Sequence, residues 1–140
     1  MFTSQLFVIL SGAAGLLYGT FLIISVLKKS EGPEAQKNIS QAIREGASAY
    51  LRRQYKTITV IAVLLAVGIY FSLNLTTAIG FLAGGFLSAL AGYIGMNVAV
   101  RSNVRVAEAA KDGLKPAFTL AFKGGAVTGF FVASLALLAV

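Results

Sequence analysis

The sequence has no cysteine, no histidine and no tryptophan, and only 12% of its 140 residues are charged. The absence of cysteine excludes disulfide frameworks and thiolate metal sites, and the absence of histidine removes the most frequent zinc ligand and general base. A typical soluble domain has about 25% charged residues, roughly twice this share. The only acidic residues are Glu31, Glu34, Glu45, Glu108 and Asp112. Most classes of soluble enzyme are therefore poor candidates.

Long apolar runs take the place of the missing polar residues, with 57% hydrophobic residues and a mean hydropathy of +0.82. All charged residues, twelve basic and five acidic, lie in two blocks at positions 28–56 and 101–123. Three stretches without charge remain, at 1–27, 57–100 and 124–140. A run of about 18 or more apolar residues is typical of a membrane-spanning helix, so the sequence predicts an integral membrane protein.

The middle stretch is long enough for two spans, and its only polar cluster, Asn74-Leu75-Thr76-Thr77, predicts the turn between them. The expected fold class is all-α, with four transmembrane helices and charged loops at 28–56 and 101–123. Basic residues outnumber acidic ones in both loops, which marks them as cytoplasmic and makes the N-terminus external. The expected helices cover residues of about 4–27, 57–73, 78–100 and 122–140.

The first charged block carries signals for a helix of its own. Glu31-Gly32-Pro33-Glu34 is expected to end the first span, and Ser40 to cap a helix that starts at Gln41 and continues into the second span. The basic cluster Arg52, Arg53 and Lys56 could attract phosphates or anionic lipid headgroups. An ordinary basic segment at the cytoplasmic interface is the simpler interpretation.

Small residues recur at helical spacing in three of the spans. In the third span Gly80, Gly84, Ser88 and Gly92 lie four residues apart and share one side of the helix, which predicts close helix packing there. The same pattern is expected to bring helices together at two further sets of glycines, Gly12, Gly15 and Gly19 in the first span and Gly125 and Gly129 in the fourth.

The three charge-free stretches contain no Asp, Glu, Lys, Arg or His, the side chains that carry protons or ions at membrane depth. This argues against a rotor-ring subunit or a small multidrug exchanger. Glu108 and Asp112, four residues apart, could share a Mg²⁺ ion, but solvated charges on a helix surface are the simpler interpretation. The sequence therefore predicts no catalytic, cofactor-binding or metal-ligating residue in this chain, and no nucleic-acid partner.

Three segments, in matching order and spacing, resemble the N-terminal region of the membrane-bound, ion-translocating inorganic pyrophosphatases. They are residues 39–55 (ISQAIREGASAYLRRQY), 91–105 (AGYIGMNVAVRSNVR) and 121–129 (AFKGGAVTG). The resemblance implies a multi-helix homodimer that hydrolyses pyrophosphate with Mg²⁺ on the cytoplasmic side and moves H⁺ or Na⁺ outward. It places this chain among the first four helices, in an outer ring, whereas the ligands of substrate and metal belong to later helices with an Asp/Lys-rich motif. That motif does not occur here.

The expected function is therefore an N-terminal scaffold segment of a larger pump in a prokaryotic plasma membrane. Its partners would be the lipid bilayer, the remaining helices of the pump and, for the whole protein, pyrophosphate. The apolar run at 134–140, which ends the sequence without a flanking charge, is expected for a piece of a longer protein. The alternative is a self-sufficient four-helix membrane protein with a structural or assembly role and no catalysis.

Overall fold

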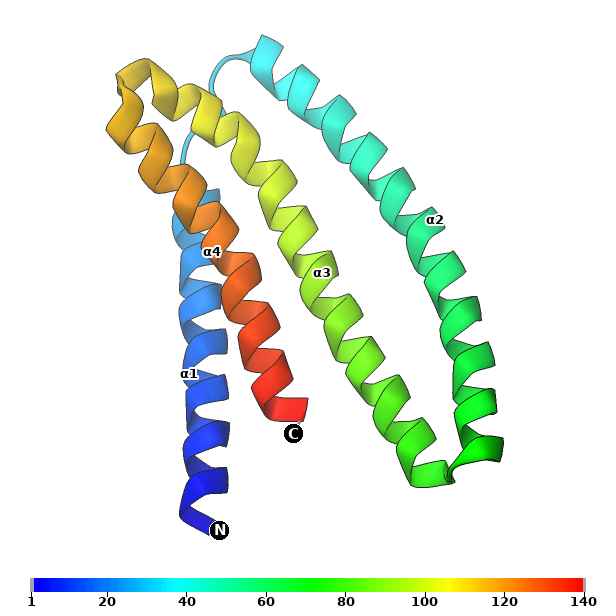
Figure 1. Ribbon diagram of the computed structural model, residues 1–140. Coiled ribbons are helices and arrows are strands. Elements are labelled where there is room, and N and C mark those ends of the chain that lie inside the picture. Colours follow the sequence, from blue (N-terminus) through cyan, green and yellow to red (C-terminus); the bar gives the residue numbers. More distant parts are fainter. Residues whose placement is uncertain (1, 140) are drawn as a thin grey trace.

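The computed structural model describes the backbone of residues 2–139 and the side chains of residues 5–139. Each of the long helices is long and apolar enough to cross a membrane, and the described residues contain no strand. The predicted all-α fold with four membrane-spanning helices is confirmed. Figure 1 shows the elements, which are α1 (Phe2–Leu27), α2 (Glu34–Ser72), α3 (Leu75–Ala109), the short 3-10 helix η1 (Ala110–Asp112) and α4 (Leu114–Ala139).

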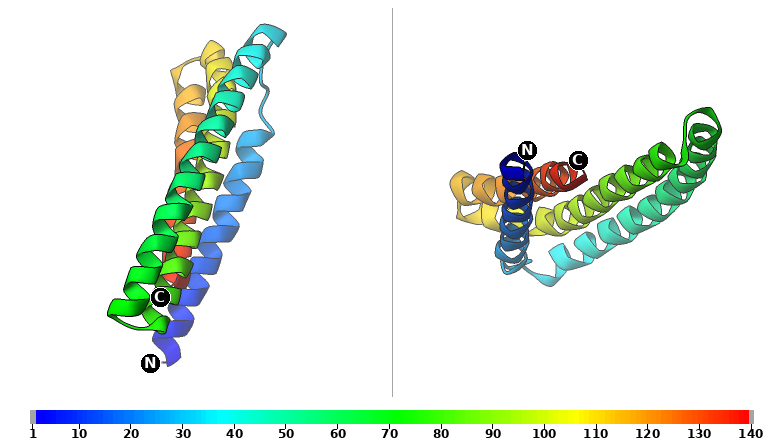
Figure 2. Two further views of the ribbon diagram at one scale, coloured as in Figure 1. Left: turned by 90° about the vertical axis from the view of Figure 1, so that its right-hand side faces the viewer. Right: turned by 90° about the horizontal axis from the view of Figure 1, so that it is seen from below.

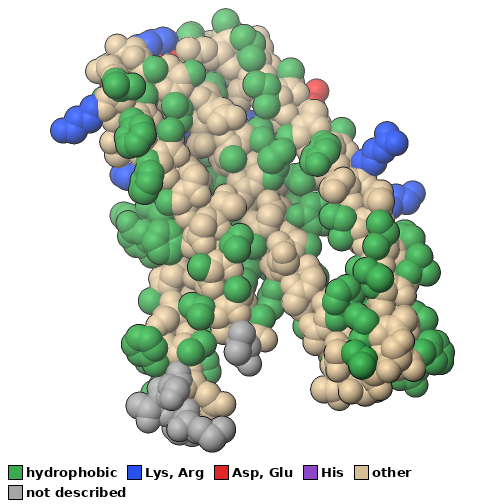
Figure 3. Space-filling view, viewed as in Figure 1, with side chains coloured by type: hydrophobic (Ala, Val, Ile, Leu, Met, Phe, Trp, Pro, Cys, Tyr) green, Lys and Arg blue, Asp and Glu red, His purple; other side chains and the backbone are tan. Residues whose placement is uncertain are grey.

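Successive helices run in opposite directions, so both charged blocks lie at one end of the molecule (Figure 1). We call this the charged end; it consists of the 28–33 connection, η1 and the adjoining turns of all four helices. In Figure 3 the Lys and Arg side chains lie in this half, and the half around the α2–α3 turn shows hydrophobic side chains. Charged and apolar segments that alternate along the sequence thus lie at opposite ends of the molecule.

The core lies among α1, α3 and α4. Its buried cluster consists of Leu22 from α1, Ala91 and Val98 from α3, and Val127 and Phe131 from α4. Within the described residues α2 packs against α3 alone, and the two form a long hairpin that extends away from α1 and α4 (Figure 2). The fold is therefore a three-helix core with one helix attached to its side.

Glycines allow the core helices to approach closely. A Cβ atom at Gly95 of α3 would lie 2.5 Å from Thr128 Oγ1, and one at Gly124 of α4 would lie 2.8 Å from Ser102 Oγ. The predicted role of the first-span glycines is confirmed, because Gly12, Gly15 and Gly19 all face α4 side chains within contact distance. Small residues at such positions let backbones approach and gain dispersion contacts.

The helices extend beyond the expected spans into both charged blocks. The prediction that Ser40 caps a helix from Gln41 is wrong, because α2 begins at Glu34 with Pro33 at its cap and Ser40 is buried within it. Proline has a fixed φ suited to a helix start and needs no hydrogen-bond acceptor there. The α2–α3 turn is shorter than predicted: Asn74 caps α3, its Oδ1 accepting the Thr77 N–H at 2.8 Å.

Substituting the central core glycine should lower stability. In the full-length protein that contains this chain, we expect Gly95→Ala to reduce the free energy of unfolding by about 1–3 kcal/mol, because the added methyl group overlaps Thr128. Gly46→Ala is the matched control, since Gly46 is an exposed position of α2 with open space around it. Thermal unfolding in detergent measures both; equal melting temperatures for wild type and G95A would show that the α3–α4 contact is looser than described.

Candidate functional site

The small-residue face predicted on α3 is not filled by this chain. A Cβ atom at Gly80 or Gly84 meets no atom within 4 Å among the described residues, and one at Gly92 would lie 3.3 Å from the Tyr55 hydroxyl. Gly84 and Ser88 line a cavity of about 280 Å³ against the end of α4. The close contacts of α3 lie instead at Gly95, which is one of the core positions. Packing at the Gly80–Gly92 face stays a prediction.

The two carboxylates considered for Mg²⁺ lie in different surroundings. Glu108 pairs with Lys111 Nζ at 2.5 Å across one helical turn, whereas Asp112 belongs to η1 and is exposed. With the amide nitrogen of Gln36 turned towards it, Glu108 Oε2 accepts a second hydrogen bond at 2.8 Å. The Glu108 carboxylate therefore joins the start of α2 to the end of α3.

The basic cluster at the middle of α2 lies beside a groove between α2 and α3. Arg52 and Tyr55 line this groove, which has a volume of about 750 Å³ and mostly apolar walls. The Tyr55 hydroxyl donates to the Ala89 carbonyl at 2.7 Å and so ties the two helices together. Arg53 and Lys56 are exposed.

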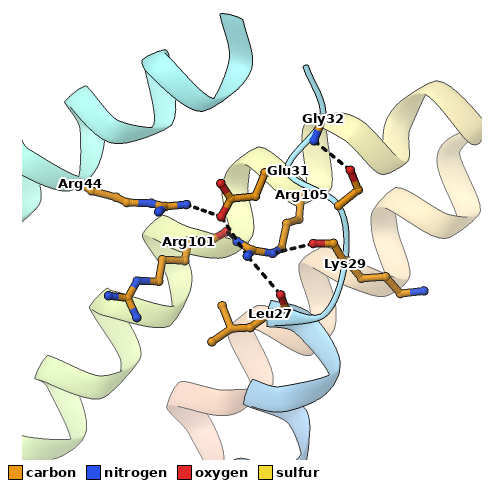
Figure 4. Close-up of polar contacts among 8 residues, drawn as sticks. Leu27, Lys29, Glu31, Gly32, Arg44, Arg101 and Arg105 are labelled. Carbon is orange, nitrogen blue, oxygen red and sulfur yellow. Dashed lines mark hydrogen bonds and ion pairs between the residues drawn. The ribbon is translucent and has the colours of Figure 1, made fainter. Parts of the chain in front are cut away.

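The strongest polar site is a group at the charged end that sequence reasoning missed. Glu31 Oε1, in the connection between α1 and α2, lies 2.7 Å from Arg44 Nη2 of α2 and 2.9 Å from Arg105 Nη2 of α3 (Figure 4). We call Glu31, Arg44 and Arg105 the carboxylate–arginine group. It links the α1–α2 connection and the first part of α2 to Arg105 of α3, which lies more than sixty residues further along the chain.

Arg105 is the most buried member, at 8% exposure. Besides Glu31, its guanidinium donates to the carbonyls of Leu27 at 3.1 Å, Lys29 at 3.0 Å and Arg101 at 2.5 Å. The Leu27 and Lys29 carbonyls lie at the C-terminal end of α1, where helix carbonyls have no partner within the helix. A positive charge at this end also interacts favourably with the helix dipole. Arg105 thus caps α1 from α3.

The connection needs glycine at one position. Gly32 has φ +79°, in the left-handed region that L residues rarely adopt, and its N–H donates to Ser30 Oγ at 3.0 Å. A Cβ atom there would also overlap the side chains of Gln36 and Glu108. Gly32 therefore allows the tight path that brings Glu31 to the two arginines.

The arginines favour the charged form of Glu31. The hydrogen bond from Arg44, helped by the charge of Arg105, lowers the pKa of the Glu31 carboxyl from its usual value of 4.5, although burial opposes this shift. The group contains no unpaired acid, base or nucleophile poised for reaction. Its chemistry is that of a structural ion pair.

The sequence held a weak signal for this group. Arg44 and Arg105 lie in the two longest segments that carry the family resemblance, but Glu31 lies in the Gly-Pro segment, which indicated only a helix end. Contacts across more than seventy residues, such as that of Arg105 with Leu27, do not follow from local spacing.

The depressed pKa of Glu31 makes the stability of the protein depend on pH. A carboxyl group whose pKa is lowered by folding stabilises the folded state above its unfolded pKa, near 4.5, and this contribution disappears as pH falls through the folded value. At pH 7 we expect Glu31→Gln to lower the free energy of unfolding of the full-length protein by about 1–3 kcal/mol, because two arginines lose their anion.

Thermal unfolding from pH 7 down to pH 3 measures the difference between wild type and E31Q. The difference should shrink below pH 4.5, as wild-type Glu31 itself becomes protonated. Glu34→Gln is the matched control, because Glu34 is exposed and lies 3.5 Å from Lys37 on the same helix. A gap between wild type and E31Q that is the same at both ends of the pH range would contradict this account.

Comparisons with known proteins show which family this chain belongs to. The family model for inorganic H⁺ pyrophosphatase matches residues 13–140. The chain is 49% identical, over 92% of its length, to a K⁺-insensitive pyrophosphate-energized proton pump of Methanosarcina mazei, and 42% identical, over 81%, to a K⁺-stimulated pyrophosphate-energized sodium pump of Thermotoga maritima. It spans 20% and 16% of these two relatives. The chain belongs to the inorganic H⁺ pyrophosphatase family.

Proposed function

We propose that this chain is the N-terminal scaffold of a membrane pump that couples Mg²⁺-dependent pyrophosphate hydrolysis to export of H⁺ or Na⁺. The observation that carries the proposal is the family match over residues 13–140, together with relatives named as proton and as sodium pumps. The chain spans only about a fifth of these relatives, so the activity belongs to the whole protein.

The scaffold role is supported by the distribution of charge. Pyrophosphate hydrolysis needs Mg²⁺ ions held by carboxylates and a positioned water molecule. The described residues hold no group of three or more candidate metal ligands, and Glu31 and Glu108 already pair with basic side chains. Ion transfer needs an ionisable group at membrane depth, and the apolar stretches 57–100 and 124–140 contain none.

The orientation we propose puts the charged end in the cytoplasm and the start of α1 outside. Excess Lys and Arg in short loops marks the cytoplasmic side, and both charged blocks are net basic. The site of action is then a plasma membrane, where pyrophosphate made in the cytoplasm reaches the pump from the charged side. We also propose that the complete pump is a homodimer.

The Gly80–Gly92 face of α3 is available for a later helix of the same pump. A Cβ atom at Gly80 or Gly84 would meet no atom within 4 Å among the described residues. Helices associate in a bilayer through close packing of small residues rather than through the hydrophobic effect. We therefore assign this face, with Ser88 and Gly92, to a contact with the rest of the protein.

The scaffold role predicts that the acidic residues near η1 are dispensable for chemistry. In the full-length pump, Glu108→Gln and Asp112→Asn should each leave the kcat of Mg²⁺-dependent pyrophosphate hydrolysis within about twofold of wild type, because neither carboxylate stabilises the transition state. Phosphate release from reconstituted pump measures this. A loss of two or more orders of magnitude in either variant, with unchanged thermal stability, would place catalysis in this segment.

The orientation predicts opposite labelling at the two ends. In a cysteine-free background of the full-length pump, Thr76→Cys should react with a membrane-impermeant maleimide on intact cells, and Ala35→Cys only after the cells are opened. Both positions are exposed, so access depends on the side of the membrane. Labelling of A35C but not T76C on intact cells would invert the proposed topology.

A further inference from the structure

A second polar feature of the charged end lies next to Arg105 of the carboxylate–arginine group. A cavity of about 490 Å³ lies between the ends of α1 and α3, η1 and the first turns of α4. Glu31 and Arg44 do not line it. Its walls carry three lysines, Lys29, Lys115 and Lys123, and three hydroxyl groups, those of Ser25, Ser30 and Thr119.

The cavity has an excess of unpaired positive charge. Two of its other charged residues are already neutralised, Arg105 by Glu31 and Glu108 by Lys111. None of the three lysines has an ion-pair partner within 4.0 Å among the described side chains. Three ammonium groups therefore share the cavity with a single unpaired carboxylate, that of Asp112. The site favours an anion.

Of the hydroxyl groups, that of Ser30 fits an anion with several oxygens, whereas the Thr119 hydroxyl donates to the Lys115 carbonyl at 2.9 Å. Ser30 Oγ accepts the Gly32 N–H at 3.0 Å, which leaves its own proton free to donate into the cavity. In Figure 4 the Lys29 side chain points away from the carboxylate–arginine group, in keeping with its place in the cavity wall. Ammonium and hydroxyl donors around one volume match the oxygens of a phosphate group.

The position of the cavity favours a lipid as the source of that phosphate. Lys29 follows the last turn of α1, and Lys123 directly precedes the charge-free stretch 124–140, so the cavity lies where the charged and apolar parts of the chain meet. On the same part of α4, Phe118 and Phe122 are 67% and 69% exposed, with ring centroids 6.5 Å apart. Exposed apolar rings at this level would contact acyl chains, and basic pockets between helices bind anionic headgroups.

We propose that this cavity binds a phosphate group, supplied by the headgroup of an anionic phospholipid. The three lysines and the Ser30 hydroxyl hold the phosphate, and the lipid chains follow the exposed surface of α4. The site adjoins the carboxylate–arginine group at Arg105, which forms part of the cavity wall. The proposal does not depend on pyrophosphate hydrolysis by the complete pump.

Native mass spectrometry of the full-length pump in detergent tests the site with two probes, phosphatidylglycerol and phosphatidylcholine. Each lysine near an anionic headgroup contributes about fivefold to affinity. The wild type should retain phosphatidylglycerol in preference to phosphatidylcholine. The triple variant K29Q/K115Q/K123Q should bind phosphatidylglycerol at least about tenfold more weakly than the wild type. The matched control is K28Q/K37Q/K56Q, which removes three lysines of the 28–56 block that do not line the cavity. It should change the affinity for phosphatidylglycerol by less than about twofold.

The source of the phosphate is decided by competition with inorganic phosphate. Phosphatidylglycerol retention that depends on the three lysines and withstands millimolar phosphate supports a lipid site. Lysine-dependent binding of inorganic phosphate without a preference for phosphatidylglycerol would retain the phosphate site but overturn its assignment to lipid. Equal losses in the pocket variant and the control, or no loss in either, would overturn the site itself.

A measurement on the unaltered protein guards against variants that fail to fold. The wild-type pump is labelled with an amine-reactive reagent, with and without added phosphatidylglycerol. The lipid should reduce the labelling of Lys29, Lys115 and Lys123. Lys37 and Lys56 should be unchanged. Protection spread evenly over all five lysines would contradict a defined pocket.

Discussion

The arrangement of α1, α2 and α3 depends on one buried cation, the guanidinium of Arg105. A charge that is 8% exposed loses most of its hydration, and this cost is met only if every donor finds a well-placed acceptor. Arg105 finds one carboxylate oxygen and three backbone carbonyls. Because two of these carbonyls end α1 and the carboxylate is held by α2, a single side chain of α3 fixes the positions of three helices.

This anchor matters most for α2, whose contacts are one-sided. Along its length α2 packs only against α3 within the described residues, and large apolar side chains such as Leu64 and Phe71 remain exposed. In a bilayer, exposure of such residues costs little, because lipid tails are as apolar as the side chains themselves. Besides its packing against α3, α2 is held by two polar contacts: the Arg44–Glu31 pair in its first third and the Tyr55 hydrogen bond near its middle. The part of α2 near the α2–α3 turn is therefore free to contact lipid or other helices.

The sequence predicts the number and alternation of the helices well, because both follow from apolar runs that a membrane requires. It predicts their ends poorly, because nothing at Arg101 or Lys115 stops a helix: charged residues form helices readily, and α3 and α4 continue past the membrane boundary. The glycine pattern correctly indicates close packing of α1. In α4, however, a Cβ atom at Gly125 or Gly129 would meet no atom within 4 Å among the described residues, and the tight contact lies at Gly124. Which glycine meets a neighbour depends on how the helices cross, and spacing along one helix does not fix that.

The same limit explains why the carboxylate–arginine group was missed while its parts were visible. Glu31 is one of three acids among seven bases in its block, and composition alone describes it as a moderating charge. The structure places two of the arginines in the interior and leaves three lysines without a carboxylate partner among the described residues. The planar guanidinium groups of Arg44 and Arg105, which can donate several hydrogen bonds in fixed directions, serve the interior, whereas the lysines Lys29, Lys115 and Lys123 have no internal partner among the described residues. The basic residues that indicate topology therefore include two arginines that hold helices together and three lysines that line a cavity without a carboxylate partner among the described residues.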